Sequence, residues 1–189
     1  MSGSPGAPLP DGTLPSPPEP VLGEIPRAFQ MTRGFGPVRI IFTASRILVY
    51  NDGDFRAFPS PDLYRSWRSA LPSGDSWRIT GAPLYPSLTP PLWNVENSGV
   101  VRVQVRQARG IGIEKDDIEI GIFLRPDQVV SGPGGSYPFR VSTALARIDL
   151  RFRAVGDARE LFVFLQHMPI GPRVTDRYAV STGWSWGPS

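Results

Sequence analysis

The chain has 189 residues, a formal net charge of +3 and a hydrophobic fraction of 40%, which suits a single domain with a closed core and an additional tail. It contains no cysteine, which excludes disulfide bonds and metal sites built from thiolates. No stretch approaches the roughly 18 uninterrupted apolar residues of a membrane-spanning helix, and the N-terminus lacks the pattern of a signal peptide, so we expect a protein that can lie on a membrane but does not cross one.

Positive charge is concentrated outside the first 26 residues and is carried almost entirely by arginine. Those first residues contain three acidic side chains and no basic one, so the remainder has 20 basic and 17 − 3 = 14 acidic residues, an excess of six positive charges. Lys115 is the only lysine. Because guanidinium groups suit phosphate and carboxylate partners, this composition favours an anionic partner, either nucleic acid or lipid headgroups.

Residues 1–26 predict a disordered, proline-rich tail. They contain eight prolines and four glycines, and too few large apolar residues to offset the entropy lost on ordering. The remaining residues, 27–189, are expected to form a single β-rich domain. The tail is either a spacer or a ligand for a host adaptor that reads extended prolines. Its densest proline motif consists of Pro15, Pro17, Pro18 and Pro20.

The domain is expected to begin with a strand and a helix. The β-rich apolar run Val38–Tyr50 ends at a turn signal in residues 51–54. Ser60–Leu71 predicts the one clear helix, because Ser60 can cap it and a proline suits the first helical position. Trp67 is expected to anchor this helix in the core. The buried face predicted from helical spacing contains Leu63, Trp67 and Ala70 or Leu71.

Residues 81–94 carry four prolines, so they predict neither a regular helix nor an interior strand. The segment is nevertheless apolar, which leaves two interpretations open. It is either a loop folded over the core or an exposed loop that docks on a membrane or a neighbouring subunit. The candidate docking residues are Leu84, Tyr85, Leu88, Leu92 and Trp93.

The second half of the chain predicts further strands, for a total of about six or seven with one clear helix. Val100–Arg106 and Leu145–Val155 alternate between apolar and polar residues. Ile111–Ile113 and Ile118–Leu124 are interpreted as a hairpin. Leu161–Leu165 is interpreted as a central strand that follows a turn at Gly156 and Asp157. A last strand is expected to present on one face Tyr178, Val180, Thr182, Trp184 and Trp186.

Arginines recur on the polar faces of two of these strands. If the strands are neighbours, their side chains form a flat basic surface that holds phosphates through salt-sensitive contacts. The alternative is an ordinary solvated face, with cross-strand pairing to Asp149 and Glu119. The residues of this candidate surface for an anionic membrane or nucleic acid are Arg102, Arg106, Arg147, Arg151 and Arg153.

No catalytic or metal centre is predicted, and no cofactor is expected. His167 is the only histidine, and it follows an apolar run, so a structural role is favoured over catalysis. A single histidine without cysteines also makes a zinc site improbable. The carboxylate pairs at residues 52–54 and 116–117 lie in predicted turns, where aspartate is expected for backbone reasons.

Several segments occur in a characteristic order. They are the strand Val38–Tyr50, Asp54–Phe58, Ser66-Trp67 in the helix, Tyr137–Arg140, the alternating strand Ala146–Phe152, Asp157 in the following turn, and Ser181–Trp184. This succession resembles the matrix proteins of rhabdoviruses, which are enveloped viruses with negative-strand RNA. Thr89–Val95 is also similar to a segment of that family, although it lies earlier in this chain.

The resemblance implies an α+β fold, in which a bent antiparallel β-sheet of about six strands packs against one or two helices behind a disordered proline-rich N-terminal tail. It implies a homo-oligomer that lies beneath the viral envelope and at the inner face of the host membrane. There it would bridge the anionic membrane surface to the viral ribonucleoprotein and support virion assembly and budding. In the family, an apolar surface loop mediates self-association, and by position Leu84–Trp93 is the candidate here.

Two departures from the family pattern argue against membrane binding by the tail and against recruitment of host budding machinery. The tail has no basic residue before Arg27, and its proline motif is not followed by a tyrosine. Two other functions remain open: a viral coat protein of β-sandwich type, and a cellular β-sandwich adaptor with a proline-rich tail.

Overall fold

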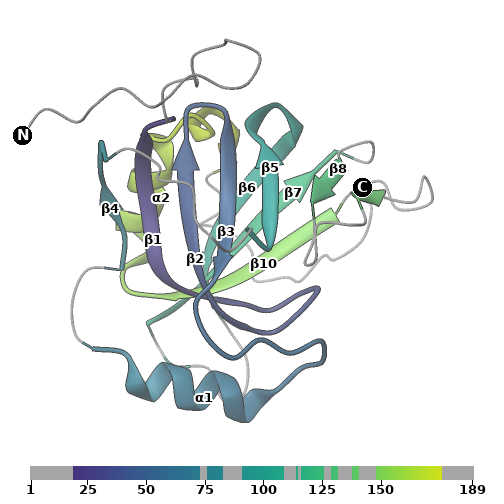
Figure 1. Cartoon of the computed structure of the whole chain (residues 1–189). Helices are drawn as coiled ribbons and strands as arrows, with labels where there is room; N and C mark the ends of the chain where they lie inside the picture. The colour runs from purple at the N-terminus through teal and green to yellow at the C-terminus, as the bar shows by residue number, and fades with distance from the viewer. Residues whose placement is uncertain are drawn as a thin grey trace, which may run out of the picture.

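The computed structural model places most of the domain. It describes residues 19–72, 76–82, 91–108, 114, 116–125, 129–131, 138–140 and 148–175. These residues form one large sheet and two α-helices, α1 (Pro61–Ala70) and α2 (Ala158–Gln166), together with the short 3-10 helices η1 (Asn97–Gly99) and η2 (Gly171–Arg173) (Figure 1). The strands are β1 (Val21–Gln30), β2 (Gly36–Thr43), β3 (Arg46–Asn51), β4 (Arg78–Ile79), β5 (Trp93–Glu96), β6 (Val100–Gln107), β7 (Asp117–Leu124), β8 (Val129–Ser131), β9 (Pro138–Arg140), β10 (Ile148–Val155) and β11 (Val174–Thr175).

The eleven strands of the described residues follow the order β11-β6-β7-β10-β1-β2-β3-β5-β8-β9, and β4 pairs with β1 off this path. β11 pairs with β6 in parallel, whereas the other pairs are antiparallel, so the sheet is mixed. The predicted combination of a dominant sheet with helices is confirmed. The predicted strand number was too low, because strands as short as β4 and β11 leave no periodic pattern in a sequence.

β1 bends the sheet. β2 pairs with both halves of β1, and the register shifts between Ile25 and Ala28. On its other edge, the first half of β1 pairs with β4, and its end pairs with β10, where Phe29 lies opposite Arg153. Pro26 falls at this irregularity, as expected because proline within a strand is tolerated at bulges.

The bend lets the two halves of the sheet share one core. β2 and β3 contribute Ile40 and Ile47, while β7 and β10 contribute Ile120 and Phe152, all at most 1% exposed. In Figure 1, β10 runs at an angle to β1, β2 and β3. α2 packs on the same core through residues that include Leu161.

α1 confirms the predicted helix, but it buries a different face. The hydroxyl of Ser60 accepts a hydrogen bond from the Leu63 N–H at 3.4 Å and caps the helix. Tyr64 is the buried residue of α1 and Trp67 is half-buried, whereas Ala70 is exposed. Leu63 is only half-buried. The buried face of α1 is therefore displaced by about one residue from the predicted face, because aromatic rather than aliphatic side chains contact the sheet.

The prediction of a strand at Leu161–Leu165 is wrong, since this segment lies in α2. Asp157 caps the helix, and its Oδ1 accepts hydrogen bonds from the N–H groups of Arg159 and Glu160 at 2.8 and 3.1 Å. A short apolar run does not distinguish a buried strand from a buried helix by itself. The cap residue three positions before Glu160 was the signal that decides it.

Two other boundaries differ from the prediction. Val38–Tyr50 lies in two strands, β2 and β3, which form a hairpin that turns at residues 44–45. The domain also begins before residue 27. Glu19 accepts hydrogen bonds from the backbone N–H and the hydroxyl of Ser45, and β1 starts at Val21 in the middle of the sheet. The predicted tail is therefore shorter than residues 1–26.

The remaining predicted strands have mixed outcomes. β6 and β10 confirm the two alternating segments, although Val101 is 42% exposed because the register shifts between Val100 and Arg102. β7 pairs with β6 and β10, whereas residues 111–113, the other strand of the predicted hairpin, lie outside the described part of the chain. The last predicted strand, in residues 178–186, also lies outside it.

Candidate anion-binding face

Three adjacent strands bring the predicted arginines together on one face of the sheet. The condition that the two arginine-bearing strands are direct neighbours is not met, because β7 lies between β6 and β10. Cross-strand partners nevertheless point to the same side of a sheet. Across the three strands the rows are Arg106, Glu119 and Arg153; Gln104, Gly121 and Arg151; and Arg102, Phe123 and Asp149. We call this surface the arginine face; Arg147 is outside the described residues.

Two of the four arginines are paired to carboxylates within the face. Arg106 Nη2 donates to Glu119 Oε1 at 2.7 Å. Arg151 Nε donates to Asp149 Oδ2 at 2.7 Å and lies 3.6 Å from Glu119 Oε1. The cross-strand pairing to Asp149 and Glu119, which was the alternative to a continuous basic plate, is therefore present. With four arginines and two carboxylates in the three rows, the face keeps an excess of 4 − 2 = 2 positive charges.

Arg102 and Arg153 are arranged differently from the two ion-paired arginines. The guanidinium of Arg102 lies over the ring of Phe123, with 4.4 Å between its central carbon and the ring centroid. Arg153 is half-buried, and its Nε and Nη1 atoms have no hydrogen-bond partner among the described residues. Buried donors of this kind are normally satisfied by protein, water or a bound ion. Arg153 therefore has hydrogen-bonding capacity that the described residues do not use.

The carboxyl group of Asp149 is electrostatically unusual. Burial raises its pKa above the ordinary aspartate value, and the charge of Glu119 raises it further, while the hydrogen bond and charge of Arg151 oppose the shift. Asp149 therefore takes up a proton at a higher pH than an exposed aspartate does. Protonation removes one negative charge from the arginine face, so acidification makes this face more positive.

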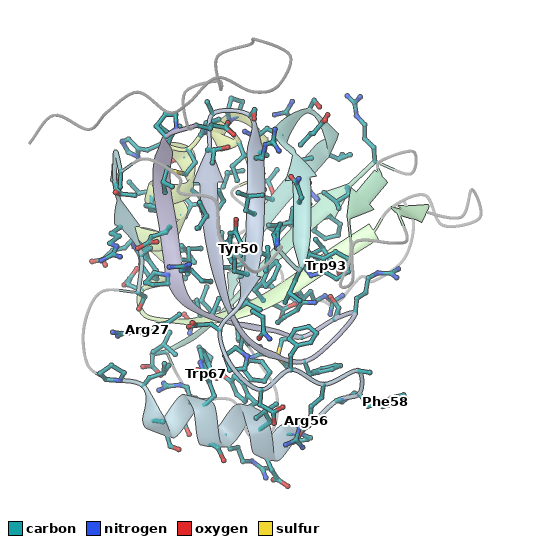
Figure 2. The ribbon with its side chains drawn as sticks, in the orientation of Figure 1. Arg27, Tyr50, Arg56, Phe58, Trp67 and Trp93 are labelled. Atoms are coloured by element: carbon teal, nitrogen blue, oxygen red, sulfur yellow. The ribbon has the colours of Figure 1, made fainter. Side chains whose placement is uncertain are left out.

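α1 is fastened at one end of the face by a buried carboxylate. Asp117 is fully buried at the start of β7, and it accepts hydrogen bonds from Tyr64 Oη at 2.5 Å and from Arg68 Nε at 2.8 Å. The backbone N–H of Glu114 also donates to it, at 3.2 Å. Burial and the hydrogen bond to Asp117 raise the pKa of Tyr64. Trp67 completes the attachment by packing on Phe29, with ring centroids 5.3 Å apart, and Figure 2 shows it on the sheet side of α1.

This attachment was missed by the sequence reasoning. Asp117 was predicted to lie in a turn, and the buried face of the helix was predicted from apolar spacing alone. The available signal was the four-residue interval between Tyr64 and Arg68, which places two donors on one face of a helix.

The structure places two of the candidate docking residues in the core. Trp93 is 4% exposed on β5, and its Nε1–H donates to Gln30 Oε1 at 2.8 Å (Figure 2). Leu92 is partly buried and packs against the main core. Trp93 therefore belongs to the core rather than to an exposed docking loop, and Leu92 contacts that core. Leu84, Tyr85 and Leu88 lie outside the described residues.

Of the proline motif, only Pro20 is described, and it is exposed immediately before β1. Pro15, Pro17 and Pro18 lie outside the described residues.

His167 is exposed at the end of α2, where its Nδ1 lies 2.7 Å from the carbonyl oxygen of Val163. Among the described residues, no group of three or more histidine or acidic side chains is placed to hold a metal ion. Within the same ranges, neither helix has the length and apolar character needed to span a bilayer.

Comparison with known proteins gives no relative: no family model, curated protein or solved structure matches the chain.

Proposed function

We propose that this protein is a non-enzymatic structural protein of the viral matrix type. It binds an anionic membrane surface through the arginine face, self-associates and links the envelope to the ribonucleoprotein. The observation that carries the proposal is the register of β6, β7 and β10, which gathers four arginines around two carboxylates on one face. The mostly β architecture with two helices is compatible with the fold that the resemblance implies.

The internal carboxylates set the strength of binding expected from this face. A basic residue near an anionic bilayer contributes about 1 kcal/mol. Since Glu119 and Asp149 compensate two of the four arginines, the net contribution is about 2 kcal/mol, which corresponds to an increase in affinity of roughly 30-fold. Such an increment makes membrane binding dependent on salt and on clustering of several copies, as suits a protein that coats a surface.

Vesicle flotation tests the proposal. The double variant Arg102→Gln with Arg153→Gln removes two positive charges from the face, while Glu119 and Asp149 keep their hydrogen bonds from Arg106 and Arg151. It should bind vesicles of phosphatidylserine and phosphatidylcholine roughly 30-fold more weakly than the wild type does.

A matched control removes the same charge elsewhere. Arg65 and Arg159 are exposed on α1 and α2 and belong to none of the three rows, so Arg65→Gln with Arg159→Gln should float with nearly unchanged affinity. Equal loss in both double variants would show that binding follows net charge alone and would overturn the assignment to this face. A coat protein should bind RNA without floating, and a cellular adaptor should do neither.

A further inference from the structure

Among the described residues, the outer side of β4 is an unpaired sheet edge. The Thr80 N–H donates to the Leu22 carbonyl at 3.0 Å and the Val21 N–H donates to the Ala82 carbonyl at 2.8 Å, so the pairing with β1 extends from Arg78 to Ala82. No described strand pairs with the other side of this segment. Ile79 is 68% exposed there.

Antiparallel pairing fixes which backbone groups remain available. Because the N–H groups of successive residues point to opposite edges of a strand, and that of Thr80 points to β1, the N–H and C=O groups of Ile79 and Gly81 point outward. Natural proteins protect such edges with lysine, proline or bulges, yet residues 78–82 contain no lysine and no proline. The one charge, on Arg78, is paired to Glu24 of β1.

The sequence of this edge is complementary to itself. In an antiparallel pair centred on Thr80, Thr80 faces Thr80, Ile79 faces Gly81 and Arg78 faces Ala82, so no like charges meet. A two-fold axis requires this reciprocity. The space beside Gly81 is open as far as the described residues are concerned, because a Cβ added there has none of their atoms within 4 Å. It can receive the side chain of Ile79 from the second copy, which lies on the same side of the extended sheet.

We propose that two copies of the chain associate through antiparallel pairing of residues 78–82 about a two-fold axis at Thr80. The inference rests on the self-association within the proposed function and assigns its surface to β4. Pairing of two five-residue edges covers less than the roughly 1,200 Å² of a stable standard interface. The dimer is therefore weak and concentration-dependent, and it forms where copies are crowded on a surface.

Site-specific cross-linking tests the register, because the chain has no native cysteine. Thr80 would form a pair without hydrogen bonds between its own backbone groups, with Cα atoms about 4.5 Å apart, which lies within the range that a disulfide spans. Under mild oxidation, Thr80→Cys should give a covalent dimer as the main product. The control Ser69→Cys, at an exposed position of α1, should cross-link at least tenfold less.

Two second-site variants in the Thr80→Cys background test the pairing itself. Ile79→Pro removes an outward N–H and keeps the hydrogen bond from Thr80 to Leu22. Gly81→Lys fills the empty space without altering the backbone, so it remains informative if the proline variant does not fold. Each should reduce the cross-link yield at least tenfold.

The outcomes separate this inference from the proposed function. Self-association of the wild type without a Thr80→Cys cross-link would overturn the β4 register alone. A wild type that stays monomeric at all concentrations would overturn both the register and the self-association. A cross-link that forms in a protein unable to bind anionic vesicles would support the β4 pairing and overturn the membrane role.

Discussion

Replacing Asp117 by alanine should detach α1 and lower the free energy of unfolding. The fully buried carboxylate accepts three hydrogen bonds, from Tyr64, Arg68 and the backbone N–H of Glu114. Hydrogen bonds to a charged group contribute about 1.5–3 kcal/mol each, and neutral ones about 1 kcal/mol. Because Arg68 is partly exposed and regains water, we expect a loss of about 3–4 kcal/mol. Urea unfolding monitored by circular dichroism measures it.

Tyr64→Phe provides the matched control, since it removes one donor and leaves the carboxylate bound to Arg68 and Glu114. Its expected cost is about 1–1.5 kcal/mol. In the double variant with Asp117→Ala the two effects should not add, because both remove the same hydrogen bond. A change below about 1 kcal/mol for Asp117→Ala would refute the view that this carboxylate holds α1 to the sheet.

Three further predictions concern the core, a cap and a titratable group. Trp93→Ala should destabilise the fold by about 3–5 kcal/mol in urea unfolding, rather than prevent oligomerisation of a folded chain, because the indole is buried and bound to Gln30. Asp157→Ala should lower the free energy of unfolding by about 1 kcal/mol through loss of the α2 cap, and Asp157→Asn by less. Because its folded-state pKa is raised, Asp149 contributes stability that is present below the pKa of the unfolded chain and lost as pH rises through the folded value. The wild type should therefore gain stability relative to Asp149→Asn as pH falls from 7 toward 4, with tighter binding to anionic vesicles, and parallel pH curves for the two proteins would contradict this.

The spacing of apolar residues predicted those strands and helices that bury one side and expose the other. β6 and β10 alternate because one side of each strand meets the core, and α1 has a cap that its sequence displays at Ser60. The hairpin between β2 and β3 was missed because both strands are largely buried, so the apolar run continues across the turn at Ala44 and Ser45. In α2 the apolar run was too short to show its period.

The arginine face shows a different limit of sequence reasoning. Alternation within each strand correctly placed Arg102 with Arg106 and Arg151 with Arg153, but it contains no information on which strand lies between them. That intervening strand brings Glu119, which decides how much of the positive charge is compensated. Strand order depends on contacts between distant segments, and a single sequence does not record them.

The position of β1 has a consequence for how the chain is made. This strand leaves the ribosome before the other described strands, yet its end pairs with β10, which is synthesised more than a hundred residues later. Contacts between such distant segments slow folding, because a long loop must close before they form. During that interval the exposed end of β1 is open to pairing with other nascent chains, so expression at low temperature or with chaperones should raise the soluble yield.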